Sequence, residues 1–548
     1  MSRLIRAGAA AALAVAIAAV GPRPFAALRN AQVTAKRGMV ASAHALASQA
    51  GIEILKAGGN AVDAAVAAAF TIGVVEPNAS GIGGEGMMVL YLAGTGKTVA
   101  IDYRSAAPAA LEFPGGIPDT GLGAVAVPGT VAGLTMALEK YGEMKLPQVI
   151  APAIRLAEQG FVVSPTLAGI VVDNFEAISR NEALAKLVCP EGLPIEAGAT
   201  LRNPDLAASL RKIAAGGADV FYRGVLADAL AADMAAGGGR ITKADLAAYR
   251  AIEREPVRGR YRDHEIVSAP PPVAGVSLVE ILQILDQFDL PKEAPLSPRY
   301  VHLAAEAMKR GFADYTANVG DPGFVKVPVA GLVSPDFARR RAAEIRPDAI
   351  TPKVTAMDPA RPESPSTTSL AVVDGRGNMV ALTQTISDFF GAKVVIGGTG
   401  IIPNNEMKNF GTRGPNALAP GKRMRTMIAP TILMKDGKPF AALGTPGAAR
   451  ILSTMTLLVS NLVDFGMGIQ EAIEAPRFYA RDIETDLSVE ARMPAATIAA
   501  LTRMGYSVKT LGEYDLFFGG AQGIVIDRRT GLRIGGADPR RDGAVVGY

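Results

Sequence analysis

Apolar positions recur at helical spacing along much of the first 320 residues. These segments lie at 41–56, 61–74, 130–141, 147–159, 203–215, 224–236, 243–250, 277–288 and 299–315. Asn60 directly precedes the second segment and is a typical helix N-cap residue. Short apolar runs at 87–92, 98–103 and 264–268 interrupt the helical pattern and predict strands. We therefore expect a first part made mainly of helices, with a few strands.

After residue 366 the pattern changes to paired strands. Runs at 368–374 and 378–385 flank a Gly-Arg-Gly turn and predict a β-hairpin. Two more hairpins are predicted, one from 431–434 with 439–443 and one from 523–527 with 532–534. Helical segments at 448–465, 468–475 and 494–504 lie between them, and the Pro-rich stretch 348–366 predicts an exposed linker. Helices in one block and antiparallel hairpins in another predict a layered α+β fold.

Composition narrows the chemistry that the chain can perform. Its 548 residues include one cysteine, Cys189, and three histidines. A single cysteine excludes an intrachain disulfide framework and a cysteine-based metal cluster. Three histidines leave a Ser-His-Asp triad possible but unpromising, and we expect neither a metal nor a cofactor. Three of the four excess positive charges are arginines within residues 1–26, so the remaining chain gives no electrostatic reason to expect nucleic acid.

Residues 1–26 have the pattern of a secretory signal peptide. Arg3 and Arg6 precede an apolar run at 9–20, which Gly21 and two prolines end. This run of 12 residues is shorter than the roughly 20 that a membrane-spanning helix needs. An uncleaved membrane anchor is the alternative interpretation. We expect a protein exported to the periplasm or the medium, with no membrane attachment once the signal is removed.

Two glycine-rich stretches look like nucleotide-binding motifs, but their context does not fit. Gly81, Gly83 and Gly86 match G-x-G-x-x-G, yet a helix precedes them and a strand follows, which reverses the order of a dinucleotide site. Residues 94–98 (GTGKT) lack the first glycine of a P-loop and lie between two predicted strands. Both stretches are predicted to be turns.

The junction at 366/367 is the most informative place in the chain. A Pro-rich segment runs directly into a strand that begins with Thr367, Thr368 and Ser369. A cut before Thr367 would give one residue both a nucleophilic hydroxyl and a free α-amine. Because an α-amine has a pKa of about 7.7–8.0, it can act as the base that activates its own hydroxyl. The alternative is that these residues simply begin an edge strand.

The segment 363–374 resembles the processing site of the γ-glutamyltransferase (γ-glutamyltranspeptidase) family of N-terminal nucleophile hydrolases. The resemblance also includes 38–77, 81–91, 101–110, 127–134, 241–262, 320–328 and 444–451, and the order and spacing of these stretches hold over nearly the whole mature chain. It implies an α+β fold of the αββα sandwich type, built from two subunits of one precursor. The large subunit would span 27–366 and the small catalytic subunit 367–548. It further implies hydrolysis or transfer of γ-glutamyl groups from amides such as glutathione, with water, amino acids or peptides as acceptors.

The resemblance also implies a role for individual residues. Thr367 matches the nucleophile and Thr385 the threonine that orients it, while the backbone N–H groups of Gly447 and Ala448 match the oxyanion hole. Arg104 matches the arginine that binds the substrate α-carboxylate. The remaining substrate-binding positions are Ser387, Glu406, Asn409 and Thr426.

The substrate-binding positions depart from the family pattern. Asn409 stands where an Asp commonly holds the α-ammonium group, and Met427 replaces a serine beside Thr426. The stretch 411–423 is also shorter than the active-site lid of lid-bearing members. These changes leave a glutaryl-type acylase, whose acyl group carries no α-amine, as an alternative. A non-catalytic exported binding protein is the second alternative.

Overall fold

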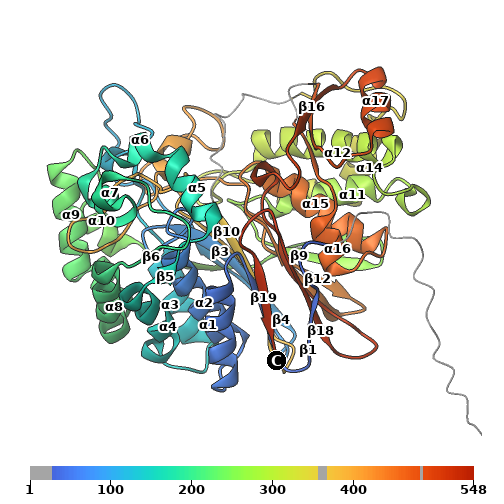
Figure 1. Ribbon diagram of the computed structural model, residues 1–548. Coiled ribbons are helices and arrows are strands. Elements are labelled where there is room, and N and C mark those ends of the chain that lie inside the picture. Colours follow the sequence, from blue (N-terminus) through green and yellow to red (C-terminus); the bar gives the residue numbers. More distant parts are fainter. Residues whose placement is uncertain (1–27, 356–366, 482–484) are drawn as a thin grey trace, which may run out of the picture.

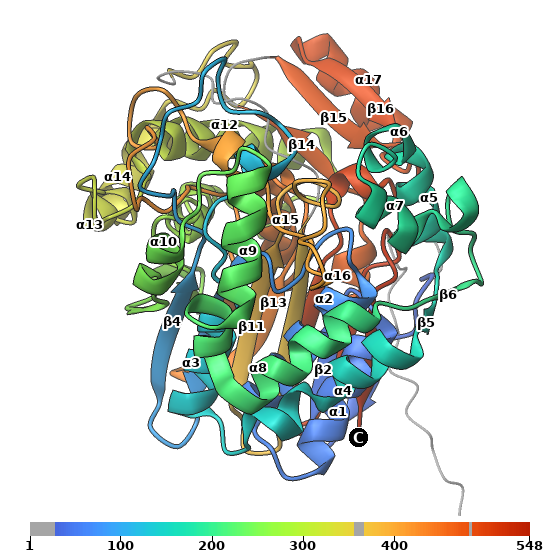
Figure 2. The same cartoon turned by 90° about the vertical axis from the view of Figure 1, so that its left-hand side faces the viewer.

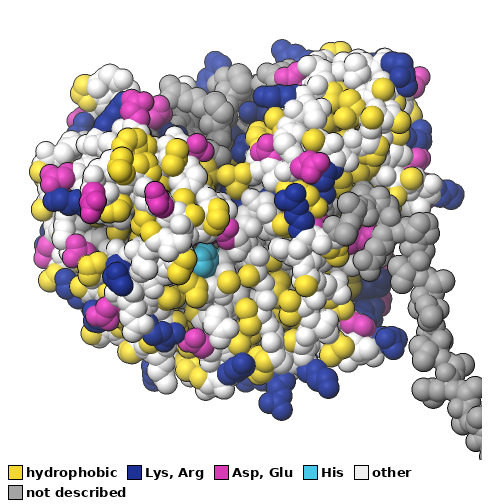
Figure 3. Space-filling model, viewed as in Figure 1, with side chains coloured by type: hydrophobic (Ala, Val, Ile, Leu, Met, Phe, Trp, Pro, Cys, Tyr) yellow, Lys and Arg dark blue, Asp and Glu magenta, His cyan; other side chains and the backbone are white. Residues whose placement is uncertain are grey.

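The computed structural model describes residues 28–355, 367–481 and 485–548 (Figure 1). The predicted signal peptide, Ser366 and residues 356–366 of the predicted linker lie outside these ranges. No helix in the described part has the length and hydropathy that a membrane span requires. On the face seen in Figure 3, basic and acidic side chains are interspersed, as expected from the nearly balanced charge.

Two seven-stranded sheets form the centre of the molecule (Figure 1). The first sheet has the order β1 (Val33–Ala35), β18 (Arg533–Ala537), β17 (Gln522–Ile526), β13 (Lys438–Gly444), β12 (Thr431–Lys435), β9 (His264–Ser268) and β8 (Val257–Tyr261). The second has the order β19 (Ala544–Gly547), β2 (Met39–Ser42), β10 (Thr368–Val373), β11 (Met379–Thr385), β3 (Glu85–Leu92), β4 (Lys97–Tyr103) and β7 (Ile252–Arg254). Each sheet combines strands from before and after residue 366.

Helices cover the outer face of each sheet (Figures 1 and 2). Beside the second sheet lie α1 (Ala45–Lys56), α2 (Ala61–Val75), α3 (Thr130–Tyr141), α4 (Leu146–Gln159), α5 (Pro165–Asp173), α6 (Phe175–Ile178), α7 (Glu182–Val188), α8 (Pro204–Tyr222), α9 (Val225–Ala236) and α10 (Lys243–Ala248). On the other side lie α11 (Gly275–Leu285), α12 (Pro298–Asn318), α13 (Val329–Leu332), α14 (Pro335–Ala343), α15 (Arg450–Val463), α16 (Ile469–Glu474) and α17 (Ala495–Met504). Smaller sheets are formed by β14 (Phe478–Ala480), β15 (Asp486–Glu490) and β16 (Ser507–Leu511), and by β5 (Phe161–Val162) with β6 (Thr200–Leu201).

The side chains of strand β10 contribute to two different hydrophobic cores. Leu370 and Val372 belong to the hydrophobic core shared with α1 and α2, whereas Ala371 and Val373 belong to the core that includes the other sheet. Successive side chains of a strand point to opposite faces, so a strand covered on both sides is apolar throughout. This arrangement of helices, two sheets and helices is the predicted αββα sandwich.

All three predicted hairpins are present, as β10–β11, β12–β13 and β17–β18. Strand β10 is hydrogen-bonded to β11 along its whole length and to β2 from Leu370 onward, so the strand that begins after Thr367 is not an edge strand of its sheet. The predicted helix at 41–56 begins only at Ala45, because residues 39–42 pair with β10 and β19 as strand β2. The sequence analysis did not identify the three-stranded sheet β14–β16 or helices α5–α7.

Both glycine-rich stretches are turns, as predicted. Residues 94–96 form the turn between β3 and β4. In the stretch 81–86, a Cβ on Gly83 would lie 2.5 Å from the carbonyl oxygen of Ile402, and one on Gly84 would lie 2.2 Å from that of Thr385. A side chain at either position would therefore clash with backbone. The glycines allow the start of β3 to pack directly against the end of β11.

Candidate active site

Thr367 lies immediately before β10, at the end of the central hairpin. Its side chain is buried, and its hydroxyl donates a hydrogen bond to Oγ1 of Thr385 over 3.3 Å. Thr385 is the last residue of β11, and its Oγ1 also accepts a hydrogen bond from the backbone N–H of Ser387 at 2.9 Å. The strand pairing thus brings together two hydroxyls that are 18 residues apart in sequence.

The backbone of Thr367 is held by a buried arginine. Nη1 of Arg541 donates to the carbonyl oxygen of Thr367 at 3.2 Å. Glu76 contacts the next residue, Thr368. Its Oε2 accepts a hydrogen bond from Thr368 Oγ1 at 2.7 Å. Burial raises the pKa of Glu76 to about 7, while the positive charge of Arg541 acts in the opposite direction. Sequence reasoning selected neither residue, although Glu76 lies inside the stretch 38–77 of the resemblance.

Gly447 and Ala448 connect β13 to the N-terminus of α15. Both residues have positive φ angles, 130° for Gly447 and 51° for Ala448. A Cβ on Gly444 would lie 2.1 Å from Oγ of Ser369, so the end of β13 closely approaches the start of β10. Backbone N–H groups at a helix N-terminus are available to bind a negative charge. The structure therefore places this predicted oxyanion segment at the same end of the sandwich as Thr367.

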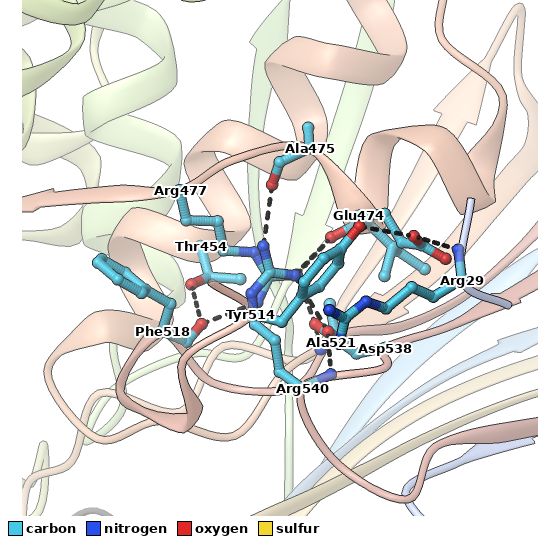
Figure 4. A network of polar contacts seen from close by, with 12 residues as sticks. Arg29, Thr454, Glu474, Ala475, Arg477, Tyr514, Phe518, Ala521, Asp538 and Arg540 are labelled. Atoms are coloured by element: carbon cyan, nitrogen blue, oxygen red, sulfur yellow. Dashed lines mark hydrogen bonds and ion pairs between the residues drawn. The ribbon is translucent and has the colours of Figure 1, made fainter. Parts of the chain in front are cut away.

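A buried polar network supports this segment (Figure 4). The carbonyl oxygen of Phe518 accepts hydrogen bonds from Nη1 of Arg477 at 2.8 Å and Oγ1 of Thr454 at 3.0 Å. Asp538 accepts a hydrogen bond from the N–H of Ala521 at 2.7 Å and forms an ion pair with Arg477 at 2.6 Å. The loop around 518–521 is thereby fixed at several backbone atoms.

This loop packs directly against the predicted oxyanion segment. A Cβ on Gly447 would lie 3.1 Å from the Cα of Gly519, and one on Gly519 would lie 2.3 Å from the carbonyl oxygen of Pro446. Since neither glycine leaves space for a side chain, the segment packs directly on the loop that the network in Figure 4 holds.

The predicted acyl-binding residues form a connected cluster. Nδ2 of Asn409 donates to Oγ of Ser387 and to Oε2 of Glu406, both at 2.9 Å. Oε1 of Glu406 lies 3.7 Å from Nη2 of Arg104. Through Ser387, this cluster reaches the backbone N–H that hydrogen-bonds Thr385. The chain of contacts therefore connects the arginine with the threonine pair.

Arg104 is completely buried, directly after β4. Its carbonyl oxygen accepts a hydrogen bond from the hydroxyl of Tyr249 at 2.7 Å, and its Nε donates to the carbonyl oxygen of Met424 at 3.4 Å. Its guanidinium also forms an ion pair with Glu85, a residue that the sequence analysis did not select. The only sequence signal for Glu85 is its position inside the glycine-rich stretch 81–86.

Thr426 is the predicted site residue with the weakest connection to this cluster. Its backbone N–H donates to the carbonyl oxygen of Pro272 at 3.4 Å, and its side chain is half-buried. Among the described residues, its hydroxyl has no hydrogen bond to another candidate. It does lie two residues after Met424, which contacts Arg104.

Sequence comparison and structural similarity identify the family. The sequence model of the γ-glutamyltranspeptidase family matches residues 47–548. The glutathione hydrolase proenzyme of Escherichia coli (strain K12) is 38% identical, over 94% of this chain and 93% of that protein. The acylase ACY 1 proenzyme of Pseudomonas sp. (strain SE83) is 43% identical, over 86% of this chain and 87% of that protein.

The chain belongs to the γ-glutamyltranspeptidase family.

Among solved structures, a cephalosporin acylase from Bacillus halodurans matches this γ-glutamyltranspeptidase relative with a TM-score of 0.88 and 33% identity. That match covers 96% of this chain and 98% of the acylase. The comparisons confirm the predicted family, the N-terminal nucleophile hydrolase fold and an enzyme of the γ-glutamyl hydrolase/transferase type. The names of the curated relatives also confirm that such chains are made as proenzymes.

A cavity of about 780 Å³ opens beside the predicted acyl-binding cluster of this family member. Asn409 lines it, together with the apolar side chains of Leu111, Phe113, Ile117 and Phe410. The segment 411–416, in the stretch that is shorter than a typical lid, forms another part of its wall. The cavity therefore offers apolar space next to the predicted acyl pocket.

Proposed function

We propose that this chain is exported and cuts itself once, between Ser366 and Thr367. The resulting enzyme hydrolyses γ-glutamyl amides such as glutathione, or transfers the γ-glutamyl group to amino acids and peptides. The observation that supports this most directly is the 3.3 Å contact between the hydroxyls of Thr367 and Thr385. Export rests on the leader pattern of residues 1–26.

In the proposed maturation, Oγ1 of Thr367 attacks the carbonyl carbon of Ser366. The peptide bond is replaced by an ester, and water then hydrolyses this ester to leave a carboxylate on Ser366 and a free α-amine on Thr367. The large subunit 27–366 and the small subunit 367–548 remain associated. Arg541 supports this step because its contact with the Thr367 carbonyl fixes the backbone of the nucleophile.

In the proposed turnover, the α-amine of Thr367 removes the proton from the hydroxyl, directly or through one water. The alkoxide attacks the amide carbon, and the N–H groups of Gly447 and Ala448 stabilise the negative oxygen that forms. The amine product leaves with the proton. Water or an amino-acid amine then attacks the threonine ester and regenerates the hydroxyl.

The proposed acyl-donor site uses the cluster around Arg104. Its guanidinium binds the carboxylate of the donor, while Glu406, Asn409 and Ser387 surround the α-ammonium. Thr426 belongs to the carboxylate side of this site. Glu406 supplies negative charge although Asn409 is neutral, so the site keeps an attraction for an ammonium group.

A glutaryl-type acylase is the second candidate. Asn409 donates both of its described side-chain hydrogen bonds through Nδ2, so it presents a donor where an ammonium needs an acceptor. The 43% identical relative named as an acylase supports the same alternative. Turnover of γ-glutamyl-p-nitroanilide and of glutaryl-p-nitroanilide by the purified enzyme decides between them, and a preference for the glutaryl compound favours the acylase.

Denaturing electrophoresis tests the proposal itself. We expect two fragments, with the smaller one starting at Thr367 by N-terminal sequencing, and turnover of γ-glutamyl-p-nitroanilide. Thr367→Ala should give one uncut, inactive chain. Thr497→Ala is a matched control, because Thr497 is also buried and hydrogen-bonded but lies in α17, and it should be cut and active. An uncut wild-type chain with full activity would overturn the proposal, and an uncut, inactive one would support a binding protein.

A further inference from the structure

Glu85 lies beside the predicted orienting threonine. It is the first residue of β3 and is paired directly with Thr385 of β11 in the antiparallel register. Side chains of directly paired residues extend on the same face of a sheet. Glu85 is completely buried, so a negative charge at this position acts on the interior of the site and has little access to solvent.

Both carboxylate oxygens of Glu85 are engaged. Oε1 forms an ion pair with Nη1 of Arg104. Oε2 accepts hydrogen bonds from the backbone N–H of Ser105 at 2.6 Å and from its hydroxyl. On the other side of the guanidinium, Nη2 faces Oε1 of Glu406 at 3.7 Å. Two buried carboxylates therefore share one guanidinium.

We propose that Glu85 is a specificity-determining residue, which competes with the carboxylate of the acyl donor for Arg104. The inference rests on the proposed role of Arg104 and deepens it. An incoming carboxylate must displace Glu85 from Nη1 or bind next to it. Two like charges in a buried site repel each other strongly, so a carboxylate-bearing donor binds less tightly than a free Arg104 would allow.

The protonation of Glu85 decides the size of this competition. Burial raises the pKa of Glu85 well above its ordinary range, Arg104 opposes this effect, and Glu406 adds to it. Tyr103 and Tyr249, which also face this group, stay neutral because burial raises their pKa values as well. A protonated Glu85 can donate a hydrogen bond to the donor carboxylate, whereas an ionised one repels it. The KM for carboxylate-bearing donors should therefore increase with pH.

A purely structural role for Glu85 makes a different prediction. If the pair with Arg104 served only folding, its loss would affect all acyl donors alike. Competition for Arg104 affects only donors with a carboxylate at the end of the acyl chain. Three anilides distinguish these cases: γ-glutamyl- and glutaryl-p-nitroanilide carry this carboxylate, and butyryl-p-nitroanilide has the glutaryl chain without it.

The experiment compares the fully cut wild-type enzyme with Glu85→Gln. Glutamine keeps an acceptor for Ser105 but offers Arg104 no charge. We expect the KM of both carboxylate-bearing anilides to fall about tenfold and to lose its dependence on pH, with the KM of the butyryl anilide unchanged. Glu280→Gln is the matched control, because Glu280 is an equally buried glutamate in α11, outside the site, and its KM values should equal those of the wild type.

The possible failures have different meanings. An equal change for all three donors, or no change for any, overturns the role of Glu85 in an otherwise active enzyme. Absence of both cutting and turnover in the wild type contradicts the proposed function instead. If the Glu85→Gln chain does not cut itself, a second experiment tests the proposal on the wild-type enzyme. It measures the inhibition constants of glutarate and butyrate at several pH values. The inhibition constant of glutarate should then increase with pH more than that of butyrate, and equal pH dependence overturns the proposal.

Discussion

The hydroxyl groups of Thr367 and Thr385 lie 3.3 Å apart, at adjacent ends of the two strands of the central hairpin. Thr385→Val keeps the shape of the side chain but removes its oxygen. We expect self-cleavage and kcat to fall about fivefold each, because a hydrogen bond contributes about 1 kcal/mol and a tenfold rate change corresponds to about 1.4 kcal/mol.

Time courses of fragment formation and of anilide turnover measure this effect. Thr385→Ser, which restores the hydroxyl, should recover most of both rates. Wild-type rates in the valine variant would show that the contact between the two threonines is not needed to orient the nucleophile.

Ala448 has a φ of 51°, a left-handed conformation that residues with a Cβ avoid. Ala448→Val adds a branched side chain and should lower the free energy of unfolding by about 1–2 kcal/mol, with a loss of kcat. Ala448→Gly should retain both stability and kcat, since glycine adopts this conformation freely. Urea unfolding and kcat measurements test the pair, and a valine variant as active and stable as the glycine variant would contradict the prediction.

Asn409 determines the charge around the predicted ammonium position. Asn409→Asp would place a second carboxylate next to Glu406, whose Oε2 now lies 2.9 Å from Nδ2 of Asn409. An ammonium group between them would relieve the repulsion, so the KM of γ-glutamyl-p-nitroanilide should fall by about tenfold. The KM of glutaryl-p-nitroanilide, which lacks the ammonium, is the control and should not fall. An equal response of the two KM values would place the ammonium elsewhere.

Glu76 makes stability depend on pH. Its pKa rises from 4.5 to about 7 on folding because of burial, so the folded state keeps a proton that the unfolded state loses. Its contribution is therefore fully present below pH 4.5 and is lost as the pH rises through 7, by about 3 kcal/mol. Relative to Glu76→Gln, the wild type should lose stability between pH 5 and 8. Urea unfolding of both proteins at both pH values tests this. The same change in the free energy of unfolding for the wild type and Glu76→Gln would be inconsistent with a titrating Glu76.

The sequence predicted the layered fold and the central hairpin because β10 and β11 are adjacent in the chain, each contains an apolar run, and a Gly-Arg-Gly turn joins them. It could not predict β2 next to β10, since residues 39–42 are followed directly by a helix and share its apolar character. The small sheet β14–β16 was missed because its strands are short and are separated by α17.

The residues of the candidate site also differ in whether the sequence alone could identify them. The resemblance selected Thr367, Thr385 and Arg104, which the structure connects through a chain of contacts. It did not select Glu85 or Arg541, which lie in the same site but act through partners distant in the chain. Their charges become significant only when folding removes them from water and places them next to a specific side chain.

Both sheets combine strands from the two sides of residue 366, and β10 lies between β2 and β11. A cut at that position creates a new chain end in the interior of a sheet, with hydrogen-bonded neighbours on both sides. The two fragments are then interwoven like the halves of a single domain. Dilution alone should not separate them, and the loss of one fragment should require the unfolding of the other.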